Sequence, residues 1–163
     1  MIDWPGRLTI CIINQKMARR RHPALAQQKA GMCPSCGTFM VEKRRALRLP
    51  VNGEEILVSS TPHLGCPKCG EIVLRFQDAR RLREDAIGIY RKRHGLLSAD
   101  EIRGIRDRFS LTQADLAGLL RLGANTVSRW ESGRNVQTAA MDMLLRLICD
   151  LPGSVQYLRN LAA

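Results

Sequence analysis

Two cysteine pairs with almost the same surrounding sequence are the strongest chemical signal in the chain. A Cys-Pro-x-Cys-Gly motif at residues 33–37 recurs at residues 66–70. Two cysteines at this spacing in a tight turn can direct both thiolates at one ion, and the following glycine lets the backbone bend. Four sulfur ligands leave no open coordination position, which favours structural zinc over catalytic zinc. The predicted zinc ligands are therefore Cys33, Cys36, Cys66 and Cys69.

Thiol redox chemistry is the competing interpretation of these motifs. A redox Cys-x-x-Cys is usually a single motif beside a helix, and neither motif here opens a helical pattern. His63, three residues before Cys66, could replace a cysteine as a ligand. Because four cysteines already fill a tetrahedral site, we interpret His63 as a loop histidine. Cys149 has no partner at ligand spacing and is interpreted as a small core residue.

A second pair of side chains has the chemistry to read DNA bases. Asn125 and Arg129 lie four residues apart in a predicted short helix over about 124–132, so they share one face, while Val127 and Trp130 form its inner stripe. Asparagine can hydrogen-bond adenine through two atoms, and arginine can do the same with guanine. The side chains that we expect to contact the DNA backbone and fix the register are Gln113, Thr126, Ser128 and Arg134.

Both base-reading candidates also have a purely structural alternative. Asn125 could simply cap the helix, since asparagine is a favoured N-cap residue. Arg129 could instead pair with a neighbouring carboxylate such as Glu131 or Asp115. The sequence leaves these alternatives open.

A β-hairpin is the element that must bring the two cysteine motifs together. Leu47, Leu49 and Val51 alternate with polar or turn residues, and Asn52-Gly53 is typical of a type I′ turn. We expect the return strand over 54–59 and a third short strand over 71–76. So small a module cannot bury enough apolar surface alone, so bound zinc is expected to supply much of its folding energy.

The C-terminal part carries successive helix signals. Ser98 and Glu101 form a capping box, and Thr112 marks a second helix start. A tight break at 121–123 precedes the helix that carries Asn125, and further helical patterns extend on both sides of Pro152-Gly153. Two short helices joined by a tight turn inside a bundle are the plan of the helix-turn-helix, whose second helix enters the DNA major groove.

These signals predict an α+β chain: a small β zinc-ribbon-like domain followed by an all-α helix-turn-helix domain of about five helices. We expect a basic, disordered arm over 1–31, a zinc-binding β domain over 32–76, a basic connector over 77–97 and a DNA-binding domain over 98–163. The connector is expected to be a helix that ends near Gly95 and joins two independently folding halves.

Composition narrows the class of protein. The 163 residues include 26 Lys+Arg and 15 Asp+Glu, and the formal net charge of +11 suits an anionic partner. The densest basic runs are 19–21 and 91–93, either of which could contact phosphates. The three histidines are scattered, and no nucleophile and base share a motif, so we expect no enzyme. Because no apolar stretch is long enough for a membrane span or signal peptide, we place the protein in the bacterial cytoplasm, associated with the nucleoid.

The run from Leu111-Thr112-Gln113 through residues 125–133 resembles the phage-repressor-like (XRE) helix-turn-helix family. Preceded by the CPxCG pair, residues 32 to about 160 resemble the MqsA family of antitoxins, also called YgiT-type zinc-finger proteins. The resemblance implies an N-terminal zinc domain that neutralises an RNA-cleaving toxin and a C-terminal domain that dimerises and represses its own operon. It also implies the zinc and base-contact roles at the residues named above. The arm before Met32 falls outside the pattern, and Arg121 stands where many helix-turn-helix proteins have glycine.

The leading hypothesis is a homodimeric, zinc-stabilised repressor of double-stranded operator DNA that acts as the antitoxin of a toxin-antitoxin pair. Its toxin would bind the N-terminal domain, and its C-terminal domain would mediate dimerisation. The alternative is a zinc-ribbon adaptor that binds another protein and uses the helical domain only to dimerise.

Overall fold

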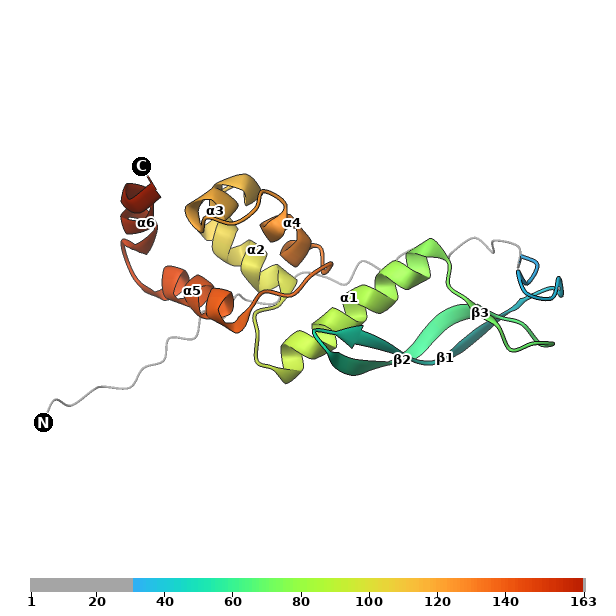
Figure 1. Ribbon diagram of the computed structural model, residues 1–163. Coiled ribbons are helices and arrows are strands. Elements are labelled where there is room, and N and C mark those ends of the chain that lie inside the picture. The colour runs from blue at the N-terminus through green and yellow to red at the C-terminus, as the bar shows by residue number, and fades with distance from the viewer. Residues whose placement is uncertain (1–30, 163) are drawn as a thin grey trace, which may run out of the picture.

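The computed structural model describes residues 31–162, and the predicted basic arm lies outside this range. A three-stranded antiparallel sheet is followed by six helices, with the cysteine motifs at one end of an elongated molecule and the last helix at the other (Figure 1). The predicted α+β class is confirmed, with five helices after the helix that covers the sheet. The elements are β1 (Val41–Val51), β2 (Glu54–Gly65), β3 (Ile72–Val73), α1 (Phe76–Arg93), α2 (Ala99–Arg108), α3 (Gln113–Leu119), α4 (Thr126–Glu131), α5 (Ala139–Asp150) and α6 (Ser154–Ala162).

The β1–β2 hairpin closes through the predicted turn. Asn52 and Gly53 have φ values of 49° and 83°, the left-handed conformation that a type I′ turn requires at both positions. A bulge near Ser60 shifts the register, and β2 continues to Gly65 rather than ending at residue 59. The hairpin therefore runs from the first cysteine motif out to the turn and back to the second.

Two local expectations in this half were wrong. The third strand covers only Ile72–Val73, and Phe76 begins α1 because an apolar stripe at helical spacing follows it. His63 is not a loop residue, since it lies in β2 with a buried side chain whose Nδ1 is 3.1 Å from the carbonyl oxygen of Thr61.

Helix α1 packs on the hairpin. Its buried residues Leu82, Ala86 and Ile87 join a cluster with the inward-facing residues of both long strands, Val51, Ile56 and Val58. Residues 77–97, expected to be a connector, therefore contribute most of a helix that belongs to the N-terminal core. The helix ends as predicted, with Gly95 at φ 63° just beyond its C-cap.

The remaining helices enclose a second core. Ile102 of α2, Leu116 of α3, Val127 of α4 and Leu145 of α5 are fully buried in one cluster. The capping boxes at Ser98 and Thr112 are both present, each joined to an acidic residue three positions later. Local sequence signals thus set the starts of α2 and α3.

Buried polar contacts tie the segment after α1 to α5. The carboxylate of Asp142 accepts hydrogen bonds from the Leu97 backbone N–H at 2.7 Å and from the Gln137 amide at 3.0 Å. Burial raises the pKa of Asp142, but its hydrogen bonds with Arg146, Gln137 and the Leu97 amide outweigh that effect and leave the pKa below its ordinary value. Leu97 is itself buried in the helical core, so these bonds anchor the segment after α1 to the helical half.

Candidate metal centre and helix-turn-helix surface

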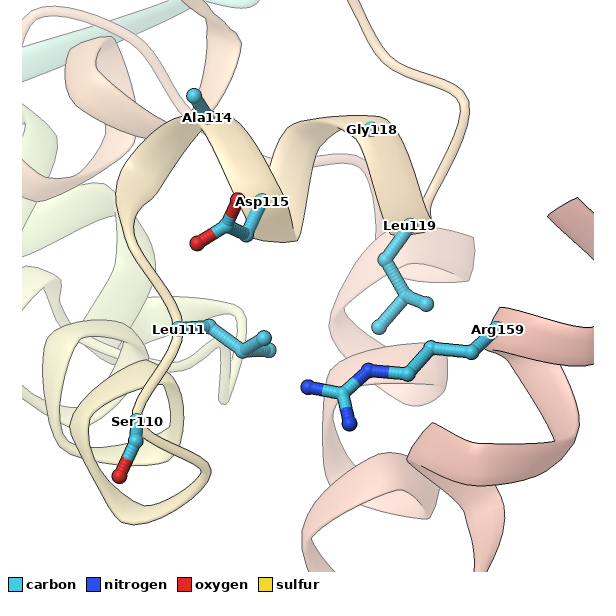
Figure 2. Close-up of a pocket in the computed structure, with 7 residues that line it drawn as sticks. All are labelled: Ser110, Leu111, Ala114, Asp115, Gly118, Leu119 and Arg159. Atoms are coloured by element: carbon cyan, nitrogen blue, oxygen red, sulfur yellow. The ribbon is translucent and has the colours of Figure 1, made fainter. Parts of the chain in front are cut away.

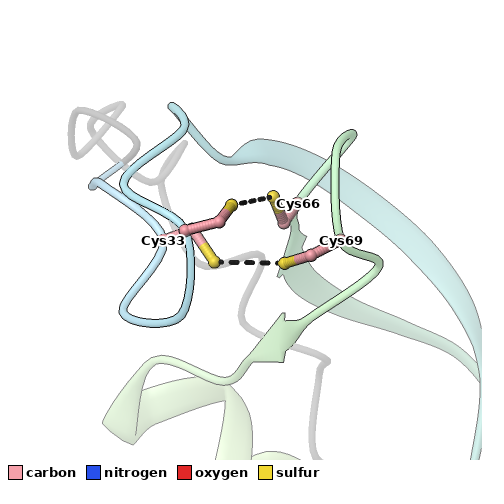
Figure 3. A group of neighbouring side chains, drawn as sticks. Cys33, Cys66 and Cys69 are labelled. Carbon is pink, nitrogen blue, oxygen red and sulfur yellow. Dashed lines mark hydrogen bonds between the residues drawn. The ribbon is translucent and has the colours of Figure 1, made fainter.

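The two cysteine motifs meet at the tip of the molecule. The four Sγ atoms of Cys33, Cys36, Cys66 and Cys69 all lie within 4.8 Å of one another. Each close pair joins one motif to the other: Cys33 to Cys69 at 3.5 Å and Cys36 to Cys66 at 3.4 Å (Figure 3). In a tetrahedral site with metal–sulfur bonds of about 2.3 Å, the sulfur atoms are about 3.8 Å apart. The observed spacing fits one metal ion bound by all four residues.

Each motif forms a tight turn that aims its cysteines at this point. The backbone N–H of Gly37 donates to the Cys33 carbonyl at 2.9 Å, and Gly70 donates to Cys66 at 3.1 Å. Both glycines have a positive φ, 70° and 75°, which a residue with a Cβ adopts only with strain. The glycine that follows each cysteine pair is therefore required by the turn.

The pKa values of two of the thiols shift in opposite directions. Hydrogen bonds with the side chain and backbone of Thr38 lower the pKa of Cys36 to about 6. The Glu71 backbone favours the Cys69 thiolate, but the neighbouring sulfur atoms outweigh it and raise the pKa of Cys69 to about 12. Four thiols this close cannot all ionise without a compensating cation, and a divalent metal ion supplies that charge.

The break between α3 and α4 explains how Arg121 replaces glycine. Arg121 has a φ of 51°, and its backbone N–H and that of Leu122 donate to the carbonyls of Gly118 and Ala117, closing the end of α3. The Arg121 guanidinium donates to the Leu161 carbonyl in α6 at 2.8 Å. The side chain thus offsets part of the backbone strain by binding α6.

Helix α4 separates its inner and outer faces as predicted. Val127 and Trp130 are buried in the helical core, while Asn125 and Arg129 are exposed. Asn125 occupies the N-cap position, but its side chain makes no capping hydrogen bond. Within residues 31–162, no carboxylate lies within ion-pair distance of Arg129. Neither structural alternative for the two base-reading candidates is therefore observed.

The four residues predicted to contact the DNA backbone differ in their exposure and contacts. Thr126 and Ser128 are half-buried, whereas Arg134 is exposed and donates from Nε to the Ser132 hydroxyl at 3.0 Å. The Gln113 amide donates to a carboxylate oxygen of Glu131 at 2.8 Å, so one of its donors is already engaged within the protein.

Glu131 is a structural residue of this region that we did not predict. Its side chain is 1% exposed and accepts from Arg106 Nε of α2 at 2.7 Å as well as from Gln113 of α3. Burial raises its pKa, but the bonds with Arg106 and Gln113 outweigh burial and lower it overall. Glu131 thus joins α4 to both preceding helices. It follows the buried Val127 by four residues, so its inward position was readable from helical spacing.

An open groove lies between α3 and α6, with a cavity volume of about 610 Å³. Figure 2 shows Arg159 reaching from α6 toward Asp115 and Leu111. Hydrogen bonds with the Thr112 side chain and backbone lower the pKa of Asp115, and the charge of Arg159 adds to this. The lining residues are Ser110, Leu111, Ala114, Asp115, Gly118, Leu119 and Arg159. They include one carboxylate, one guanidinium and the apolar side chains of Leu111, Ala114 and Leu119.

Among the helices of the described residues, none is both long enough and apolar enough to cross a membrane.

The fold and the sites define a class of protein in which a four-cysteine β module is joined to a helix-turn-helix bundle. A family model described as "Antitoxin component of bacterial toxin-antitoxin system, MqsA" matches residues 31–159, and the chain belongs to this family. The resemblance noted in the sequence is thereby confirmed. The chain is also 32% identical over 65 residues to Antitoxin HigA-2 of Vibrio cholerae serotype O1 (strain ATCC 39315 / El Tor Inaba N16961). That match covers 40% of this chain and 62% of the relative's own length.

We predict that each chain binds one metal ion through the four cysteines. Cys36→Ser should abolish stoichiometric binding, because serine does not supply a thiolate, and a chelator should unfold the β module. Elemental analysis gives the metal content, and the NMR signals of the module report its folding. Cys149→Ala is the matched control, since this buried cysteine lies in the helical core. Full metal content in Cys36→Ser would contradict the assignment.

Proposed function

We propose that the protein is a non-enzymatic antitoxin that represses its own operon by binding operator DNA, with structural zinc in the four-cysteine site. Zinc is the expected metal because four soft sulfur ligands in a closed tetrahedral site favour it. Membership of the antitoxin family supports the biological role. The single observation that carries DNA recognition is the exposed pair Asn125 and Arg129, which no intramolecular contact explains.

The surroundings of this pair favour reading of bases in the major groove. Val127, Trp130 and Glu131 hold the opposite side of α4 in the protein, so the exposed side chains project from a fixed helix. A rigid support lowers the entropy lost when these side chains order on DNA. Thr126, Ser128 and Arg134 lie close in sequence to Asn125 and Arg129, so they could contact phosphates beside the bases that this pair reads. The side-chain amide of Gln113 has a second N–H beyond the one that binds Glu131.

Alanine substitution of the base-reading pair tests this function. Asn125→Ala and Arg129→Ala should each cost roughly 1–3 kcal/mol of specific operator binding, and the double variant should lose specificity while keeping its helical content. Fluorescence anisotropy with the protein's own promoter and a scrambled duplex measures both affinities. Arg134→Ala is the control, because loss of a phosphate contact weakens binding to both duplexes and reduces the salt slope by about 1. Retained operator specificity in the folded double variant would refute the proposal.

We also propose that the chain is a homodimer through α5 and α6. Met143 and Leu147 lie one helical turn apart on α5, and Tyr157 and Leu161 are related in the same way on α6. All four are exposed, while Leu145 and Ile148 on the other side of α5 are buried. An exposed apolar face of this kind typically marks an interface. A two-fold dimer would present two copies of α4 to half-sites about 34 Å apart.

Leu147→Glu should convert the dimer to a monomer, because it places a charge in the middle of this apolar face. Sedimentation velocity measures the change, and operator affinity should fall with it. Leu57→Glu, at another exposed leucine on β2, is the matched control and should remain dimeric. Unchanged sedimentation of Leu147→Glu would argue against this interface.

The toxin is proposed to bind the β module near the cysteine turns. Phe39 is 71% exposed and pairs across an isolated bridge with Met32, which is also exposed. Val41, two residues further along the chain at the start of β1, is exposed as well. These apolar side chains at the tip of the module supply the kind of surface that a protein partner covers.

Phe39→Glu should weaken binding of the toxin about tenfold or more, as expected for an aromatic side chain at the centre of an interface. The measurement is calorimetric titration with the product of the reading frame adjacent to the gene. Metal content and operator binding should stay unchanged, and Leu57→Glu on the distal part of the hairpin should bind normally. Wild-type affinity of Phe39→Glu would exclude this surface, and capture of an unrelated protein without DNA binding would favour the adaptor hypothesis.

A further inference from the structure

One arginine of α1 is buried in the opposite half of the molecule. Arg91 is 3% exposed, and its Nη2 donates to the carbonyl oxygens of Trp130 at 3.1 Å and Asn135 at 3.2 Å. Trp130 belongs to the last turn of α4, and Asn135 follows the end of that helix. Arg91 of α1 therefore binds the C-terminal end of α4, the helix that carries Arg129 and is preceded by Asn125.

Two further contacts place the same segment against α1. A Cβ built on Gly133 would lie 3.2 Å from Cγ of Glu84, so the backbone after α4 passes close to α1. Val136 is buried in the hairpin–α1 cluster rather than in the helical core. The stretch from Trp130 to Val136 is therefore held by the N-terminal half along its length.

The burial of Arg91 excludes a direct role in DNA binding. A guanidinium that is 3% exposed cannot reach a phosphate, although its neighbour Lys92 is exposed. Burying a charge is costly unless hydrogen bonds compensate it. The two carbonyls supply part of that compensation at Nη2, whereas the buried Nε has no hydrogen-bond partner among the described residues. Burial accordingly lowers the pKa of Arg91, while the negative charge of Asp142 opposes this.

We infer that Arg91 is a positioning residue for DNA recognition: it fixes the end of α4 to α1, so that the β module and the recognition face form one mechanical unit. This inference rests on the proposed DNA binding. It makes the β module a determinant of operator affinity without any contact between that module and DNA. A protein partner that displaces α1 would thereby change the presentation of Asn125 and Arg129.

Operator binding at several salt concentrations separates positioning from phosphate contact. Arg91→Met should lower operator affinity about tenfold at every salt concentration, because the carbonyls at the end of α4 lose a charged donor. The slope of log affinity against log salt should stay unchanged, since no phosphate contact is lost. Arg91→Lys, which keeps the charge but not the planar fork, should be intermediate. Lys92→Met is the matched control, removing an adjacent exposed cation from the same helix.

Amide hydrogen exchange tests the same contact in the absence of DNA. The backbone N–H groups of Arg134 and Asn135 donate to the Arg129 carbonyl at 2.9 Å and 3.2 Å. Both should exchange about tenfold faster in Arg91→Met, while the amides of the β1–β2 hairpin keep their wild-type rates. If Arg91→Met fails to fold, the same two measurements on Arg91→Lys decide.

The outcomes are distinct. Wild-type affinity and wild-type exchange at Arg134 and Asn135 in a folded Arg91 variant would overturn the inference, and so would a reduced salt slope, which would indicate a phosphate contact. A wild-type chain that does not bind its operator would instead refute the proposed function, and the exchange rates would still decide whether Arg91 positions the end of α4.

Discussion

Mutual repulsion among four clustered thiolates is the constraint on which the N-terminal half depends. Their sulfur atoms lie within 4.8 Å of one another, so ionising one thiol opposes ionising the next. A single divalent cation bound by all four sulfur atoms would remove this repulsion. One motif precedes β1 and the other follows β2, so a metal ion bound by both would join the two strands at the open end of the hairpin. Helix α1 packs on these two strands.

The position of α4 in the helical half depends on two buried charged side chains, Glu131 and Arg91. Glu131 is held by Arg106 and Gln113, and Arg91 is held by the carbonyls of Trp130 and Asn135. Removing one partner of such a contact leaves a buried charged group without its hydrogen bond, which is strongly destabilising. Helix α4 is only six residues long and has little stability of its own. Its orientation is therefore set from outside, by α2, α3 and α1.

The sequence was sufficient for several features that depend on short-range geometry. The spacing of Cys33 and Cys36 and the glycine after them specify the metal-binding turn, since both are properties of five consecutive residues. Asn52-Gly53 specifies the hairpin turn, and the capping boxes specify the starts of α2 and α3, for the same reason. The separation of Val127 and Trp130 from Asn125 and Arg129 follows from helical periodicity alone.

Contacts between distant segments were decided by the tertiary structure. A string of basic residues over 77–97 has the composition of a solvated connector, and only packing against Val51 and Ile56 shows that it forms part of a core. Arginine is found mostly at the surface and histidine is intermediate, so the burial of Arg91 and His63 depends on partners that no local pattern reveals. The sequence by itself thus determined the four-cysteine cluster, the turns and the outward face of α4. The tertiary structure decided how that face is held, because burial of a charge depends on which groups arrive from elsewhere in the chain to compensate it.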